Sequence, residues 1–116
     1  DMIAMVEFTR ASTFLGTLTT ALQMVHDAAH PHMRVLFDCY HFWAGRSKFE
    51  DLDLGRPGDI GHVHFQDVPD MPRELLDQTT RVIPSDGVTP LVKILRKLSE
   101  KGYAGALSVE PPWPLV

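Results

Sequence analysis

The sequence predicts an α/β fold of about four parallel strands with intervening helices, for three reasons. Four short apolar runs are nearly continuous in hydrophobicity, as parallel strands covered on both faces tend to be. Amphipathic helical patterns separate the runs. The first three runs end at Phe8, Cys39 and Phe65, a spacing of about 26 to 31 residues that is close to a βα repeat. This order suits either a small open sheet or four consecutive units of a (β/α)8 barrel, which needs ~250 residues when complete.

Composition narrows the class of protein. The chain has 116 residues, 44% of them hydrophobic and 22% charged, which is typical of one small domain or part of a larger one. Its net charge of −4 argues against a nucleic-acid partner. Cys39 is the only cysteine, so no intrachain disulfide can form. The longest stretch without charge or histidine, 11–25, is shorter than the ~20 residues of a membrane span. We therefore expect a cytoplasmic protein without a membrane partner.

The first half of the chain contains two predicted strands and two predicted helices. Residues 2–8 and 35–39 are the apolar runs expected to form the strands. Between them, Thr17 suits an N-cap, and an apolar stripe with helical spacing follows it. The stripe consists of Leu18, Ala21, Leu22 and Val25. A shorter helix is expected over 47–54, ending near the sequence Arg56-Pro57-Gly58.

The second half contains two more strands, over 60–65 and 106–109, and one strongly marked helix. Thr89 suits the cap of that helix, Pro90 its first position, and Gly102 its C-terminal stop. Its apolar stripe consists of Leu91, Ile94, Leu95 and Leu98. The loop over 66–88 is too short for a core of its own, and its prolines interrupt regular structure. We expect it to be a loop on the substrate side and not a second domain.

Acidic and histidine side chains stand where the apolar runs stop. Glu7 and Asp38 end the first two runs, His62 and His64 lie in the third, and Glu110 follows the fourth. A lone carboxylate at a strand end is usually a helix cap or a solvated charge. Four strands in phase instead indicate a site, because the carboxyl edge of parallel strands is where α/β folds place their chemistry. His62 and His64 share one face by the period of two, so spacing leaves open which of them contributes.

The chemistry of this residue set predicts a divalent metal ion. Carboxylates gathered in one site repel each other and resist ionising unless a cation joins them. Oxygen ligands with one imidazole suit Mn²⁺, Mg²⁺ or Co²⁺ better than an ion that prefers thiolates. Cys39 directly follows Asp38, so its side chain should point to the opposite face of the strand, and we do not expect it to be a ligand.

Five segments, in this order and at this spacing, are similar to those of a known group of enzymes. They are Val6-Glu7-Phe8, Phe37-Asp38-Cys39-Tyr40-His41, His62-Val63-His64-Phe65-Gln66-Asp67, residues 81–87 and residues 102–110. The chain resembles the C-terminal half of the xylose isomerase-like barrel superfamily, the sugar phosphate isomerase/epimerase group. The resemblance implies the C-terminal half of a (β/α)8 TIM barrel. Residues 1–116 would then be a single partial domain, with the N-terminal half of the barrel outside this chain.

The resemblance also implies roles for individual residues. Members bind one divalent metal through Glu, Asp, His and Glu at successive strand ends, which here implies Glu7, Asp38, His64 and Glu110. The resemblance thus selects His64 over His62. It further implies that Glu7 and Glu110 act as the catalytic acid and base.

Two substrate contacts follow from the same resemblance. Members carry a His three residues after the metal Asp and an Arg shortly before a Pro-Gly turn, which here implies His41 and Arg81. The turn departs from the usual pattern, because Ser85 stands where the first Gly of Pro-Gly-x-Gly is usual. This departure bears on the loop geometry and on the placement of Arg81.

These residues predict a metal-dependent isomerase or epimerase of a small sugar or keto-polyol, acting by proton transfer through a metal-stabilised enediolate. Mn²⁺ is the expected ion, with Mg²⁺, Co²⁺ or Zn²⁺ as alternatives. A lyase of the inosose dehydratase type shares the first step and stays open, and a phosphodiesterase of the endonuclease branch ranks third. A non-enzymatic alternative also stays open, in which the chain is an inactive fragment or a half-barrel that needs a partner. Homo-oligomerisation is left open because the outer strands present free edges.

Overall fold

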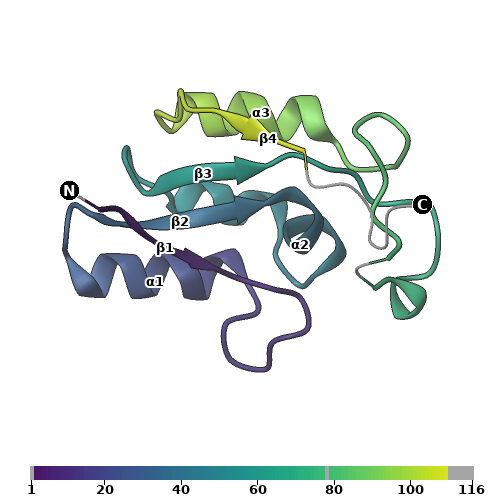
Figure 1. Ribbon diagram of the computed structural model, residues 1–116, viewed down its shortest axis with the longest axis horizontal. Helices are drawn as coiled ribbons and strands as arrows, with labels where there is room; N and C mark the ends of the chain where they lie inside the picture. The colour runs from purple at the N-terminus through teal and green to yellow at the C-terminus, as the bar shows by residue number, and fades with distance from the viewer. Residues whose placement is uncertain (1, 78, 110–116) are drawn as a thin grey trace.

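The computed structural model describes residues 2–77 and 79–109. Its centre is one sheet of β1 (Ala4–Glu7), β2 (Met33–Asp38), β3 (Ile60–His64) and β4 (Leu107–Ser108). The strands are ordered β1-β2-β3-β4, and each neighbouring pair is parallel (Figure 1). The predicted α/β fold with four parallel strands is therefore confirmed, although each strand is shorter than, or shifted from, its apolar run.

The helices lie on the outer side of the sheet, with α1 (Leu18–Ala28) along β1 and β2 and α3 (Leu91–Glu100) beside β4 (Figure 1). Val35, Phe37 and Val63 point to this side and are fully buried in a core shared with both helices. Because side chains alternate along a strand, Leu36 and Asp38 face the other side of β2. The site residues are thus carried on the face that the helices leave uncovered.

The first helix forms as its sequence predicts. Thr17 has an extended backbone, and its Oγ1 accepts the N–H of Thr20 at 3.3 Å, so it caps α1. The buried side chains of α1 are the four of the predicted stripe, Leu18, Ala21, Leu22 and Val25. Burying one face of a helix in this way contributes more to its stability than local propensity does.

Two boundaries differ from the sequence-based expectation. The expected cap Thr89 is wrong: α3 begins at Leu91, and Pro90 stands at the cap position without a side-chain hydrogen bond. Thr89 serves the preceding loop instead, since its Oγ1 accepts the N–H of Val68. The helix expected over 47–54 is a 3-10 helix, η1 (Phe49–Leu54). A second short 3-10 turn, η2 (Arg73–Leu75), lies in the long loop.

One helix has no counterpart among the predicted elements. The chain leaves β2 at Asp38 and enters α2 (Cys39–Ala44) without any connecting loop. The sequence of α2 is apolar or aromatic on almost every side, so it lacks the periodicity by which a half-buried helix is recognised. Phe42 packs against Phe37 in the core, with ring centroids 5.0 Å apart. Among the described residues, no helix is long and apolar enough to cross a membrane.

Ser85 occupies a backbone conformation that favours glycine, with φ = 86°. We expect Ser85→Gly to raise the free energy of unfolding by about 0.5–1 kcal/mol. The left-handed penalty of ~1–2 kcal/mol is removed, while glycine costs ~0.5–1 kcal/mol of chain entropy. Urea unfolding of the complete protein measures this. The control is Ser99→Gly on the exposed side of α3, which should lower stability, because helical glycine is unfavourable. Equal losses at both positions would contradict the expected relief of strain.

Candidate metal centre

Parallel pairing brings the predicted ligand residues to one edge of the sheet. Glu7, Asp38 and His64 are the last residues of β1, β2 and β3. Asp38 is paired directly with His64, and Glu7 is paired with Leu36, two residues before Asp38 on the neighbouring strand. All three side chains therefore arise at the carboxyl ends of their strands, which is the edge where parallel α/β folds place their chemistry.

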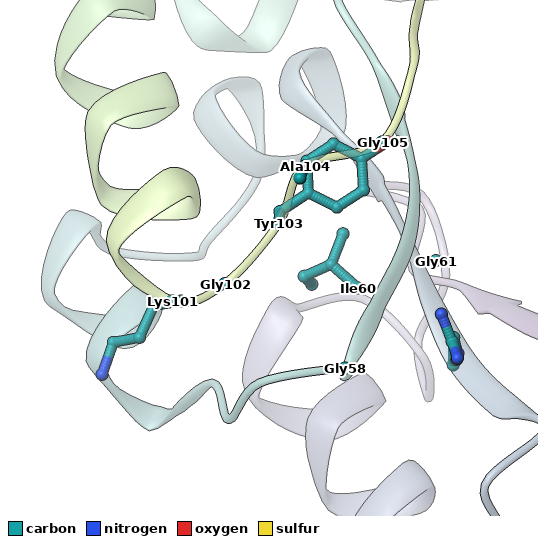
Figure 2. A pocket seen from close by; sticks show the side chains of 9 residues that line it. Gly58, Ile60, Gly61, Lys101, Gly102, Tyr103, Ala104 and Gly105 are labelled. Carbon is teal, nitrogen blue, oxygen red and sulfur yellow. The ribbon is translucent and has the colours of Figure 1, made fainter.

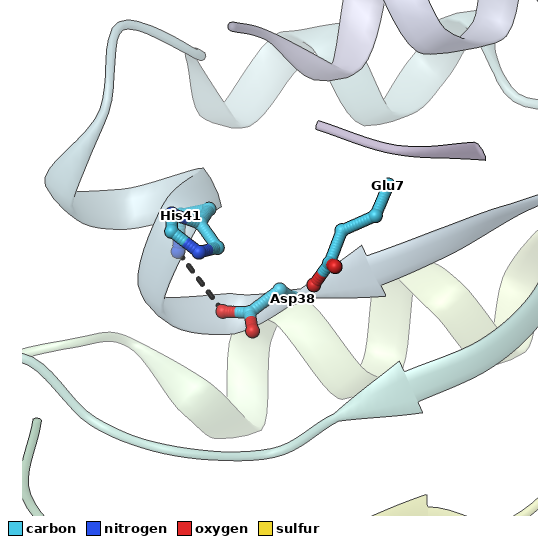
Figure 3. A group of neighbouring side chains, drawn as sticks. All are labelled: Glu7, Asp38 and His41. Atoms are coloured by element: carbon cyan, nitrogen blue, oxygen red, sulfur yellow. Dashed lines mark hydrogen bonds between the residues drawn. The ribbon is translucent and has the colours of Figure 1, made fainter. Parts of the chain in front are cut away.

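The side chains converge there. One potential ligand atom from each of Glu7, Asp38 and His41 lies within 4.8 Å of the other two (Figure 3). His64 Nδ1 lies 3.4 Å from Asp38 Oδ2 and 3.8 Å from Glu7 Oε2. The structure therefore places three of the four residues expected as ligands together, with His41 beside them. Glu110, the fourth, lies outside the described residues.

The two histidines of β3 have different surroundings, although spacing alone could not separate them. His62 Nε2 lies 2.7 Å from Ser108 Oγ on β4. His64 lies one pleat closer to the carboxyl end and contacts the two carboxylates. The geometry thus agrees with the selection of His64 that the family resemblance implies.

Asp38 is fully buried and has two structural tasks. Its Oδ1 accepts the backbone N–H of His41 at 3.0 Å, so Asp38 is the N-cap of α2 (Figure 3). Its carboxylate also accepts the side-chain amide of Gln66. Sequence reasoning missed Gln66, although the period of two from His62 and His64 was a signal that it shares their face. Asp38 can therefore cap α2 through Oδ1 while its Oδ2 faces His64 in the candidate metal centre.

Cys39 is separated from this site chemically. Its side chain is fully buried in the helix-facing core. Burial, and then the charge of Asp38, raise the pKa of the Cys39 thiol to about 12. Cys39 is therefore a neutral core residue, as its position after Asp38 predicts.

His41 is held by contacts at both ring nitrogens. Nδ1 lies 3.1 Å from the backbone nitrogen of Arg10, and Nε2 lies 3.2 Å from Nη2 of Arg81. A guanidinium can only donate and a neutral imidazole accepts at one ring nitrogen, so His41 accepts either from Arg10 at Nδ1 or from Arg81 at Nε2, and its other nitrogen carries the proton. Arg10 itself is anchored by its guanidinium to the carbonyl oxygens of Ala44, Leu76 and Arg73. These contacts fix the ring at the edge of the site.

Arg81 reaches the site from the long loop, and Asp67 organises that loop. Asp67 and Val82 form an antiparallel bridge next to Arg81. The buried carboxylate of Asp67 also accepts the backbone N–H groups of four loop residues, Val68, Ser85, Gly87 and Thr89. Burial by itself would raise the pKa of Asp67, but hydrogen bonds from Thr89, Val68 and Gly87 outweigh burial and hold it below its usual value. The loop is therefore a fixed part of the site edge.

Two hollows lie at opposite ends of the sheet. One of ≈ 570 Å³ adjoins His41 and is lined by Thr9, Arg10, Ala11, Tyr40, His41, Leu76 and Asp77. The other, of ≈ 280 Å³, lies where β3 begins and includes Gly58, Ile60, Gly61 and Tyr103 (Figure 2). The second hollow is at the amino end of the strands, remote from the carboxylates. Only the first adjoins the candidate metal centre.

The arrangement of four parallel βα units with acidic strand ends can be compared with known proteins. A family model described as "Xylose isomerase-like TIM barrel" matches residues 2–115. The chain belongs to the xylose isomerase-like TIM barrel family. The expected resemblance is thereby confirmed, and the four-stranded sheet is part of a TIM barrel.

Relatives within the xylose isomerase-like family include sugar isomerases and epimerases. The inosose isomerase of Halalkalibacterium halodurans is 34% identical over 96 residues, which are 83% of this chain and 34% of that protein. The D-psicose 3-epimerase of Enterocloster bolteae is 26% identical over 98 residues, covering 84% of this chain and 29% of that protein. The chain thus spans about a third of the length of the curated relatives it matches.

A solved structure also supports membership of this family. The crystal structure described as the IOLI protein with a binding zinc atom superimposes on this chain with a TM-score of 0.88 and 29% sequence identity. The superposition covers 97% of this chain and 41% of the chain in that crystal structure.

Proposed function

We propose that the complete protein carrying this chain is a divalent-metal-dependent isomerase or epimerase of a small sugar or other polyhydroxy carbonyl compound. The observation that carries the proposal is the convergence of Glu7 and Asp38 with the imidazole of His64 at the carboxyl ends of parallel strands. The names of the similar inosose isomerase and D-psicose 3-epimerase support this substrate class.

The residues at the strand ends fit a divalent cation. A fully buried Asp38 next to the carboxylate of Glu7 would be costly without a compensating positive charge. We propose Glu7, Asp38, His64 and Glu110 as the ligands. This oxygen-rich set suits Mn²⁺ first, while the zinc of the similar crystal structure keeps Zn²⁺ as an alternative. A cation held there would act as a Lewis acid on the substrate carbonyl and make the adjacent C–H acidic.

In the proposed mechanism, Glu7 and Glu110 act as the base and the acid. The carboxylate of one removes a proton from the hydroxyl-bearing carbon beside the carbonyl, and the carboxylic acid of the other delivers a proton to carbon. Delivery to the opposite face of the same carbon gives an epimer. Delivery to the former carbonyl carbon gives an isomer, and the proton of the neighbouring hydroxyl group then passes to the former carbonyl oxygen. Proton exchange with solvent restores the two carboxyl groups. We propose that Arg81, whose Nη2 lies 3.2 Å from His41 Nε2, donates to a substrate oxygen, and that His41 contacts the substrate beside it.

The remaining part of the barrel is part of this proposal. The chain covers 41% of the similar zinc-containing structure and about a third of the inosose isomerase. We propose that residues 1–116 form the C-terminal half of the barrel. The other strands, with further substrate contacts, then come from sequence outside these residues or from a partner. The hollow beside His41 would form part of the substrate site in the closed barrel.

Replacing Glu110 by glutamine tests the proton transfer. In the complete protein with saturating Mn²⁺, we expect turnover of an inosose or ketose to fall by at least ~10²-fold, because a positioned acid or base contributes ~10²–10⁴-fold. Exchange of the substrate C–H with D₂O, followed by NMR, should fall in parallel. Release of water from the substrate in these assays would favour the lyase alternative.

The matched control is Glu100→Gln at the end of α3, where the carboxylate lies 3.5 Å from Lys97 Nζ. This variant should keep normal turnover. A Glu110→Gln enzyme with near-normal turnover and normal metal content would remove the proposed acid–base role.

A further inference from the structure

Gln66 lies just beyond β3 and is fully buried. Its Nε2 donates to both carboxylate oxygens of Asp38, at 2.9 Å to Oδ1 and 3.0 Å to Oδ2. The next residue, Asp67, accepts backbone N–H groups of the long loop. Two consecutive residues therefore hold the Asp38 carboxylate and the long loop, respectively. The amide of Gln66 is therefore a direct partner of the carboxylate proposed as a metal ligand.

The two oxygens of Asp38 are not equivalent in this arrangement. Oδ1 accepts the backbone N–H of His41 at 3.0 Å as well as the Gln66 amide, which occupies both of its lone-pair directions. Oδ2 accepts the same amide and lies 3.4 Å from His64 Nδ1. The oxygen left with capacity for a cation is therefore Oδ2, on the side of His64.

A purely structural role does not account for glutamine at this position. Gln66 Oε1 is buried without a hydrogen-bond donor among the described residues, and such a group costs ~1–3 kcal/mol. An apolar side chain of similar volume would avoid that cost. A cationic side chain would neutralise Asp38 and compete with a metal ion, whereas the amide orients the carboxylate and leaves its charge intact.

We propose that Gln66 is a positioning residue that makes Asp38 a one-oxygen metal ligand, with Oδ1 occupied and Oδ2 presented beside His64. This inference rests on the metal site of the proposed function. It adds Gln66, which would not itself contact the ion, and it specifies that Asp38 would bind the ion through one oxygen.

The test is titration of the metal-free complete protein with Mn²⁺ by calorimetry. Gln66→Leu removes the amide, and we expect the dissociation constant to rise ~10–100-fold, the usual effect of deleting an outer partner of a metal ligand. Gln66→Met, with an unbranched side chain, should give the same rise and serves as the second variant if leucine does not fold. The matched control is Gln23→Leu, which deletes a Gln–Asp hydrogen bond of 2.7 Å to Asp27 on the exposed side of α1. It should leave the dissociation constant unchanged.

The outcomes separate this inference from the proposed function. Wild-type protein that binds no divalent ion would overturn both. Tight binding by wild type and equally tight binding by the folded Gln66 variants would overturn the role of Gln66 alone, leaving a packing residue whose loss shifts only the melting temperature. In a Mn²⁺-loaded crystal structure, we expect one Asp38 oxygen within the ~2.0–2.6 Å of a ligand bond. Two oxygens at that distance in the wild-type protein would overturn the assigned binding mode.

Discussion

Asp38→Asn is expected to weaken Mn²⁺ binding by the complete protein at least ~10³-fold, or about 4 kcal/mol at ~1.4 kcal/mol per tenfold. The substitution removes the one fully buried charge among the described ligand residues. Of the described ligands, only Glu7 and His64 then remain to bind the ion. Asparagine is a good N-cap, so α2 should keep its cap, and the Gln66 amide can turn its oxygen toward the new donor. The fold should therefore survive while metal affinity falls, as calorimetry and metal analysis would measure.

The control for this substitution is Asp51→Asn on η1. The Asp51 carboxylate also accepts a backbone N–H near a helix start, from Lys48 at 2.8 Å, but at an exposed place away from the strand ends. Metal affinity should be unchanged in this variant. Full metal occupancy in Asp38→Asn would mean that Asp38 is only the cap of α2.

Asp67→Ala is expected to lower the free energy of unfolding by about 3 kcal/mol or more, since each unsatisfied buried donor costs ~1–3 kcal/mol. Four backbone N–H groups of the loop lose their acceptor, at distances that now range from 2.8 to 3.1 Å. The loop segment next to Arg81 should loosen as well, so substrate affinity should fall while Mn²⁺ affinity is kept. Denaturant unfolding, substrate binding and metal titration measure these three effects.

The pH dependence of stability gives a second measure of Asp67. Its pKa is lower in the folded chain than in the unfolded one, so its stabilisation is complete above the ordinary Asp pKa of ~3.9 and is lost as the pH falls through the folded pKa. When the pH falls below about 4, the free energy of unfolding of Asp67→Ala should therefore decrease less than that of the wild type. The control is Asp77→Ala, whose exposed carboxylate accepts the N–H of Thr79, and which should cost less than ~1 kcal/mol. Equal losses for both variants would contradict the clamping role of Asp67.

Local pattern was sufficient for the sheet and for α1. The apolar runs were strands because residues such as Val35, Phe37 and Val63 are buried in the core that the sheet shares with the helices. Local pattern failed at α2 and at Thr89. The first is too short and too uniformly apolar to show a period, and the second bonds to Val68, 21 residues earlier in the chain.

The candidate site was predictable in part for a similar reason. Glu7, Asp38 and a histidine of β3 stand at the ends of consecutive parallel strands, so the phase of the strands implied that they meet, while the choice of His64 over His62 came from the family resemblance. Arg10 carries no such signal, and for Gln66 the period of two from His64 indicates only which face of the strand it shares. Their roles depend on which groups lie opposite them, namely the ring of His41 and the carboxylate of Asp38.

The sequence by itself determined the order of the strands and that acidic and histidine side chains stand at their carboxyl ends, because periodicity and strand phase are local properties. Only the tertiary structure decided how those side chains are held. It placed His64 against the carboxylates and His62 against Ser108, it made Asp38 the N-cap of α2, and it placed the Gln66 amide against the Asp38 carboxylate. These outcomes depend on contacts between residues up to 46 positions apart in the chain, where distance and direction, and not residue type, decide which hydrogen bond forms.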